Sequence, residues 1–177
     1  MIIEDPIILL VDDSENDALL MCTIYSRAGF VRPLQFARDG AEAIAYLNGD
    51  GLFRDRRQFP MPAVVLLDLN MPQKNGFEVL EWIRAQPGLK RLRVYILSAS
   101  SQEKDIQRAY DLGANSYLVK PGNLDGLRHL AKTLAAWLKI SHFALLVEAN
   151  DEQRVGLFTS PAASLAPFGS GQTAAIR

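Results

Sequence analysis

The chain has 177 residues, of which 49% are hydrophobic and 22% charged, a balance typical of one globular domain with a sizeable core. Its formal net charge of −1 gives no overall positive field to attract nucleic acid or an anionic membrane surface. The single cysteine, Cys22, cannot form an internal disulfide, and no apolar stretch approaches the roughly 20 residues that span a bilayer. We therefore expect a cytoplasmic protein that binds neither nucleic acid nor membranes.

Four short apolar runs predict strands at residues 7–11, 63–67, 94–97 and 117–119, and residues 34–37 are a weaker fifth candidate. Continuous runs of this kind are typical of strands buried on both faces of a parallel sheet. Between the runs, apolar residues recur with helical spacing, and we expect them to form the core. Alternating strands and helices predict a doubly wound α/β fold, with five parallel strands in the flavodoxin-like order and helices on both faces.

Helix boundaries are indicated by three local patterns. Asp39 with Glu42, and Ser100 with Glu103, have the spacing of a capping box at the start of a helix. Gly113 lies where a helix would end in a left-handed residue. These patterns place two helix starts and one helix end.

Two segments interrupt the alternation. Residues 48–62 are longer than a usual connection and carry three arginines, for which a solvated loop or helix extension is expected and docking of an acidic partner is the alternative. Residues 143–147 are apolar and strand-like, whereas residues 160–177 are rich in Ala, Ser, Gly and Pro. We predict a folded domain over residues 1–140, followed by an arm and a disordered tail over residues 141–177.

Polar side chains follow four of the five predicted strands. Asp12 and Asp13 come after the first strand, Asp68 after the third, Ser98 after the fourth and Lys120 after the fifth. Because ligands in such sheets bind beyond the carboxyl ends of the strands, we expect these side chains to converge on one functional edge.

The chemistry of this edge depends on its crowded carboxylates. Three carboxylates repel one another unless a hard cation neutralises them, and few oxygen ligands with room for water and phosphate favour magnesium over a calcium cage. One Cys and two distant His exclude a structural zinc site. A carboxylate can also act as a nucleophile that forms an acyl phosphate, and Lys120, Ser98 and the metal could stabilise the transferred group.

Four segments together resemble the receiver domain of two-component response regulators. They read Leu-Val-Asp-Asp at 10–13, Leu-Asp-Leu-Asn-Met-Pro at 67–72 followed by Gly76, Leu-Ser-Ala at 97–99 and Tyr-Leu-Val-Lys-Pro at 117–121. The resemblance covers residues 7–138. It implies a phosphorylation-dependent switch that receives its phosphoryl group from a sensor histidine kinase or a histidine phosphotransfer protein, and that is not an enzyme beyond this chemistry.

The resemblance also implies roles for the residues at the predicted edge. Asp68 would be the phosphoacceptor and would also contact the metal ion. The Mg²⁺ ion would be bound directly by Asp13, through water by Asp12, and by the backbone carbonyl of Asn70. Lys120 would pair with the phosphoryl group.

Other roles concern the transmission of the signal. The Ser98 hydroxyl would turn toward the phosphoryl group while Tyr117 swings inward, which is a two-state switch. Asn70 and Ser100 would help to set the lifetime of the phosphoryl group. The resemblance also predicts a cis Lys120–Pro121 peptide bond, which proline makes accessible.

The long segment at residues 48–62 and the absence of an output domain resemble the small regulators that serve bacterial phytochromes, so the kinase would be light-sensing. Too few residues follow residue 138 for a DNA-binding helix-turn-helix domain, so output would pass through protein contacts. We expect a homodimer through the predicted fourth helix, fifth strand and fifth helix, with residues 141–150 as an arm. The alternatives are a magnesium-dependent enzyme resembling aspartyl-phosphate phosphatases and a receiver-like protein that binds its partner constitutively.

Overall fold

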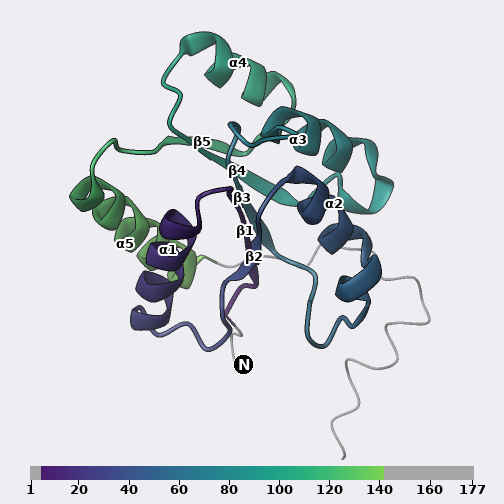
Figure 1. The fold of residues 1–177 in the computed structure, drawn as a ribbon, viewed down its shortest axis with the longest axis horizontal. Helices are drawn as coiled ribbons and strands as arrows, with labels where there is room; N and C mark the ends of the chain where they lie inside the picture. The colour runs from purple at the N-terminus through teal and green to yellow at the C-terminus, as the bar shows by residue number, and fades with distance from the viewer. Residues whose placement is uncertain (1–4, 142–177) are drawn as a thin grey trace, which may run out of the picture. The chain divides into compact units, whose positions relative to one another are not determined.

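The computed structural model describes residues 5–141, in which five parallel strands form one sheet with helices on both faces (Figure 1). The strands are β1 (Ile8–Val11), β2 (Gln35–Ala37), β3 (Val64–Leu67), β4 (Arg93–Ser98) and β5 (Ser116–Val119). The helices are α1 (Glu15–Arg27), α2 (Gly40–Asn48), α3 (Gly76–Ala85), α4 (Glu103–Asp111) and α5 (Leu124–Ile140), with short 3-10 helices η1 (Gly51–Arg54) and η2 (Pro87–Leu89). The strand order is β2-β1-β3-β4-β5, which confirms the predicted flavodoxin-like fold.

Two apolar cores lie on the two faces of the sheet. Successive residues of β1 point to opposite faces, so Leu9 and Val11 join the core beneath α2 and α3, whereas Ile8 and Leu10 join the core beneath α1 and α5. All four side chains are buried because β1 lies between two other strands. A central strand that is covered on both faces must be apolar throughout, which is why this strand could be recognised as a continuous run.

The starts of α2 and α4 differ in how their caps form. At α2, the Asp39 carboxylate accepts a hydrogen bond from the backbone N of Glu42 at 2.7 Å, but the Glu42 carboxylate accepts from the backbone N of Arg38, so only half of the predicted capping box forms. The predicted cap at Ser100 is wrong, because α4 begins only after Gln102. The Ser100 hydroxyl instead donates to the carboxylate of Asp105, in the first turn of α4, at 2.5 Å.

Residues 48–62 form a largely exposed connection that includes the 3-10 helix η1, and a few of their side chains hold it to the domain. The Arg56 guanidinium donates to the backbone oxygens of Tyr46 and Leu47, both at 2.7 Å, and to that of Phe59 at 3.3 Å. The rings of Tyr46, Phe53 and Phe59 pack together, with centroids 5.1–6.0 Å apart. Arg56 thus satisfies the last carbonyl groups of α2, which a helix leaves without partners of its own.

The Lys120–Pro121 peptide bond differs from the sequence-based prediction. The Lys120–Pro121 peptide bond is trans, so the predicted cis bond is wrong. Trans is the ordinary isomer, favoured before proline by about 0.5–1 kcal/mol, and in this geometry the Lys120 backbone N donates to the Ser98 oxygen at 2.8 Å.

The predicted arm and tail, from residue 142 onward, lie outside the described residues. Within residues 5–141, no helix is both long and apolar enough to cross a membrane.

Candidate metal centre at the carboxyl edge of the sheet

The strand register brings the predicted site residues to one edge of the sheet. β1 and β3 pair with Val11 opposite Leu67, so the residues that follow them, Asp12 and Asp68, leave the sheet at the same level. Ser98 is the last residue of β4, and Lys120 follows the end of β5. The structure therefore assembles side chains from four strands at the edge where a doubly wound sheet places its ligands.

The three carboxylates form a compact cluster. One oxygen from each of Asp12, Asp13 and Asp68 lies within 4.8 Å of the others, with Asp12 and Asp68 buried and Asp13 exposed. Oxygen ligands at this spacing fit a hard divalent cation, and the exposed side of the cluster leaves room for water and a further ligand. The carboxyl edge is therefore a candidate metal centre.

Each buried carboxylate is held at both of its oxygens. Oδ1 of Asp12 accepts from the backbone N of Ser14 at 3.0 Å, and Oδ1 of Asp68 accepts from the backbone N of Asn70 at 3.1 Å. The remaining oxygens, Oδ2 of both residues, face the ammonium of Lys120. These contacts fix the orientation of the two carboxylates before any ligand arrives.

Lys120 lies at the centre of the negative charge. Its Nζ donates to Oδ2 of Asp12 at 2.6 Å, of Asp68 at 2.9 Å and of Asp17 at 3.4 Å. Burial alone would lower the pKa of Lys120, but hydrogen bonds and charges from Asp12 and Asp68 outweigh it and raise the pKa above the ordinary value. The ammonium therefore stays protonated and can pair with an incoming anion.

The pKa of Asp12 is also raised, because desolvation by burial outweighs the hydrogen bond and charge of Lys120. The raised pKa of Lys120 and the raised pKa of Asp12 are compatible. One ammonium is shared among three carboxylates, so it does not fully offset the desolvation of Asp12. A metal ion would supply the missing positive charge.

Gly76 is required by the close packing beside the nucleophile candidate. A Cβ added at Gly76 would lie 2.1 Å from the backbone oxygen of Asp68 and 2.8 Å from the Cα of Leu69. Since no side chain fits in that space, α3 can begin this close to the edge only with glycine at this position.

Ser98 and Tyr117 belong to a hydrogen-bonded network behind the carboxylates. The Ser98 hydroxyl accepts from the Asn70 side-chain amide and from the backbone N of Ser100, both at 3.3 Å. The Tyr117 hydroxyl donates to the backbone oxygen of Ser100 at 2.9 Å, and its ring packs against the core beneath α2 and α3. The structure thus connects the predicted switch residues through the loop that begins at Ser98.

Asp17 was not among the residues singled out from the sequence. It lies in the first turn of α1, where an acid is usually explained by the helix dipole. Its proximity to Lys120 joins residues 103 positions apart in the chain, so only the fold reveals it.

Comparison with known proteins gives a consistent result. Residues 8–132 match the model of the response regulator receiver domain. The response regulator Rcp1 of Synechocystis sp. is 37% identical over 134 residues, which are 75% of this chain and 89% of Rcp1. The crystal structure of the Mn(2+)-bound form of Rcp1 matches with a TM-score of 0.72 at 36% identity, over 78% of this chain and 99% of that one.

Two further solved structures extend the similarity. The phosphorylated cyanobacterial phytochrome response regulator RcpA has a TM-score of 0.69 at 38% identity, over 78% of this chain and 97% of RcpA. The response regulator RPA3017, in red light signalling of R. palustris, has a TM-score of 0.69 at 35% identity, over 78% of this chain and 98% of RPA3017.

Proposed function

This chain belongs to the response regulator receiver family, and on that premise we propose that it is a switch in which Asp68 accepts a phosphoryl group. As a receiver domain it is a signalling regulator rather than a catalytic enzyme, apart from its phosphoaspartate chemistry. The observation that supports Asp68 as the acceptor is the position of its carboxylate, which accepts a hydrogen bond from the Lys120 ammonium and lies within 4.8 Å of a carboxylate oxygen of both Asp12 and Asp13.

The transfer is a displacement at phosphorus. An Asp68 carboxylate oxygen forms a bond to the phosphorus as the bond between phosphorus and the donor atom breaks, and the donor leaves with the bonding electrons. Lys120 is released from the Asp68 oxygen and its ammonium pairs with a phosphoryl oxygen. The Ser98 hydroxyl, which now accepts two hydrogen bonds, turns to donate to another phosphoryl oxygen.

We propose Mg²⁺ as the metal ion, held by Asp12, Asp13, Asp68 and the backbone carbonyl of Asn70. When bound, the ion would neutralise the clustered carboxylates and the oxygens of the transferred group. The compact spacing of the three carboxylates supports a divalent cation, as does the description of the Rcp1 structure as Mn(2+)-bound.

The switch itself involves Ser98 and Tyr117. When the Ser98 hydroxyl moves to the phosphoryl group, it leaves its hydrogen bonds with Asn70 and Ser100. Because Tyr117 is bonded to the backbone of Ser100, the loop carries the change to the face formed by α4, β5 and α5. We propose that Asn70 and Ser100 also set how long the phosphoryl group persists.

The partner that supplies the phosphoryl group is proposed to be a histidine kinase of the bacteriophytochrome type, or a histidine phosphotransfer protein, acting in the cytoplasm. Receiver domains partner histidine kinases, and RcpA and RPA3017 are described as regulators in phytochrome and red light signalling. These relatives support the light-sensing assignment.

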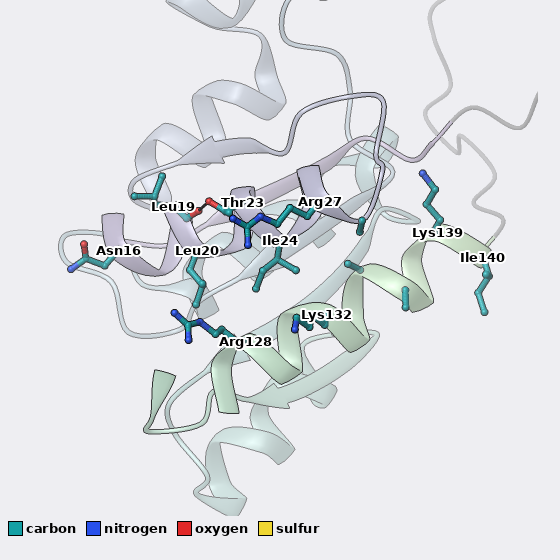
Figure 2. A pocket seen from close by; sticks show the side chains of 13 residues that line it. Asn16, Leu19, Leu20, Thr23, Ile24, Arg27, Arg128, Lys132, Lys139 and Ile140 are labelled. Atoms are coloured by element: carbon teal, nitrogen blue, oxygen red, sulfur yellow. Dashed lines mark hydrogen bonds between the residues drawn. The ribbon is translucent and has the colours of Figure 1, made fainter. Parts of the chain in front are cut away.

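A groove between α1 and α5 is the proposed docking surface for this kinase. Its volume is about 870 Å³, and Figure 2 shows α1 side chains such as Leu19 on one wall and α5 side chains such as Lys132 on the other. α1 begins two residues after Asp13, so a partner that brings phosphohistidine to Asp68 must pass along this helix. Leu19 is 68% exposed and offers an apolar contact there.

A second surface is proposed for self-association. Besides Ile140, which lines the groove between α1 and α5, four large apolar side chains are exposed on α4, β5 and α5, and they are Tyr110, Val119, Leu124 and Trp137. Association of two chains through this face would bury them and would join the output of the switch to the oligomeric state.

Intact-protein mass after incubation with acetyl phosphate tests the proposed function. We expect one phosphoryl adduct that requires Mg²⁺ and is lost in Asp68→Asn. Absence of the adduct on the native chain would favour the constitutive binding protein, whereas continuous release of phosphate from a small phosphomonoester would favour the phosphatase-like enzyme.

The proposed docking surface is tested by Leu19→Glu. This variant should slow phosphoryl transfer from a cognate kinase, while acetyl phosphate still labels Asp68 at the native rate.

A further inference from the structure

Three carboxylates contact the Lys120 ammonium, and the third belongs to an unassigned residue. Asp17 Oδ2 lies 3.4 Å from Lys120 Nζ, and its side chain is 30% exposed, compared with 2% for Asp12 and 9% for Asp68. Asp17 is therefore the outer acid of the group, on the flank formed by α1.

The capping role that an acid at this position usually has is already filled. In a capping box, the side chain three residues after the N-cap returns to the backbone N–H of the cap. Here the N-cap is Ser14, and its backbone N donates to Asp12 at 3.0 Å. The Ser14 hydroxyl in turn accepts from the backbone N of Asp17 at 3.2 Å, which fixes the Asp17 backbone and leaves its carboxylate to Lys120.

Asp17 also differs from the other two acceptors in what happens during phosphorylation. Asp12 and Asp68 belong to the cluster that fits a metal ion, and Asp68 is the proposed nucleophile. Their oxygens would therefore contact the metal ion and the phosphoryl group when these are bound. Asp17 lies outside the cluster, so its carboxylate stays available to the ammonium throughout the transfer.

We propose that Asp17 is a positioning residue that holds the Lys120 ammonium on the α1 side of the site while the phosphoryl group arrives. This inference rests on the proposed function of Asp68. The backbone of Lys120 is fixed by its hydrogen bond to Ser98, and Asp17 fixes the other end of the side chain. With both ends held, the ammonium points at the place where a phosphoryl oxygen must lie, and little ordering is left for the reaction.

The test compares two acids of the same helix turn in the full chain. Asp17→Asn removes the contact with Lys120, whereas Glu15→Gln removes an equal charge from an exposed acid whose field acts on Arg38. We expect Asp17→Asn to lower the rate constant at saturating acetyl phosphate by roughly 10- to 100-fold, the scale typical of losing a group that orients a site residue. The half-saturating concentration of acetyl phosphate should stay within about twofold, because the interaction acts in the transition state. The affinity for Mg²⁺, measured by titration calorimetry, should change no more in Asp17→Asn than in Glu15→Gln, since both variants remove one negative charge.

A second measurement does not depend on phosphorylation. In the metal-free protein, the ¹⁵N resonance of the Lys120 ammonium should move in Asp17→Asn and stay in place in Glu15→Gln. An unchanged resonance, a native rate constant in Asp17→Asn, or an equal loss in Glu15→Gln overturns the inference. A native chain that takes up no phosphoryl group would instead refute the proposed function, and the resonance would still decide whether Asp17 holds Lys120.

Discussion

Two buried tyrosines differ in whether the hydroxyl has a partner. The Tyr46 hydroxyl donates to the backbone oxygen of Pro60 at 2.8 Å, whereas that of Tyr25 has no hydrogen-bond partner among residues 5–141. We expect Tyr46→Phe to lower the free energy of unfolding by about 1 kcal/mol, because a hydrogen bond is lost, and Tyr25→Phe to raise it by up to about 1 kcal/mol, because an unpaired hydroxyl is removed. Urea denaturation measures both. Changes of the same sign in the two variants would contradict the assignment.

The stability of the metal-free protein should depend on the charge of Asp12. Burial raises the pKa of Asp12 above its ordinary value of 3.8, so the folded protein binds this proton more tightly than the unfolded chain. The resulting stabilisation is complete below about pH 3.8 and is lost as the pH rises through the raised pKa. At pH 7 the ionised carboxylate therefore destabilises the fold, and Asp12→Asn should raise the free energy of unfolding of the metal-free protein.

Magnesium should reverse this order. A ligand that binds only the folded state at a hundredfold excess over its dissociation constant stabilises by about 2.7 kcal/mol, and Asp12→Asn should lose most of that gain. Thermal unfolding with and without Mg²⁺ measures the effect, with the exposed Asp125→Asn as the control. If Mg²⁺ stabilises Asp12→Asn as much as the native chain, Asp12 is not a metal ligand.

At the scale of single residues, the site at the carboxyl edge of the sheet could be predicted from the sequence, but several side-chain contacts in the fold could not. Asp12, Asp68 and Lys120 could be placed together because each follows a recognisable strand, and the ends of parallel strands meet. The contact of Asp17 with this site could not be predicted, and neither could the contacts of Arg56 elsewhere in the fold. Each side chain acts through a partner that only the packing brings near. For Asp17 that partner lies 103 positions away, and for Arg56 it is the end of a neighbouring helix.

At the scale of elements, the segment at residues 48–62 depends on one side chain. Arg56 makes hydrogen bonds with three backbone carbonyls, and Lys at this position could not spread its single ammonium over them. We expect Arg56→Lys to lower the free energy of unfolding by about 1–3 kcal/mol, because partly buried carbonyl groups lose their donor. Arg57→Lys, at an almost fully exposed neighbour, should have no measurable effect in the same urea titration. An equal loss in both variants would mean that Arg56 does not fasten the segment.

The predicted strands agree with the structure to within one residue, and β1 and β3 were the clearest because each is an uninterrupted, fully buried apolar run. β4 is longer than its run at both ends, since Arg93 and Ser98 also pair in the sheet. The start of α4 was misplaced because Ser100 satisfies the spacing rule for a cap while its hydroxyl is held by Asp105. Local patterns thus fix where an element exists, and competing side-chain contacts decide where it begins.

For the whole molecule, the order of the sheet determines which surface can report on the site. β5 is an edge strand, and its residues are less buried than those of β1 or β3. Exposed apolar side chains lie on β5 and on the helices α4 and α5 beside it. β5 is also the strand that leads to Lys120. This is the surface that the proposed switch would reach through β5.

This arrangement predicts how the oligomeric state responds to mutation. Val119→Glu places a charge on the exposed part of β5, and we expect it to shift the protein from dimer to monomer in sedimentation velocity experiments, because burying an unpaired carboxylate is unfavourable. Phosphorylation by acetyl phosphate should be unchanged, since Val119 points away from the acid cluster to solvent at 42% exposure. Val31→Glu, at an even more exposed site before β2, is the matched control. A native chain that stays monomeric at all concentrations would refute the proposed self-association. A dimer that survives Val119→Glu and is broken by Val31→Glu would place the interface away from the α4–β5–α5 face.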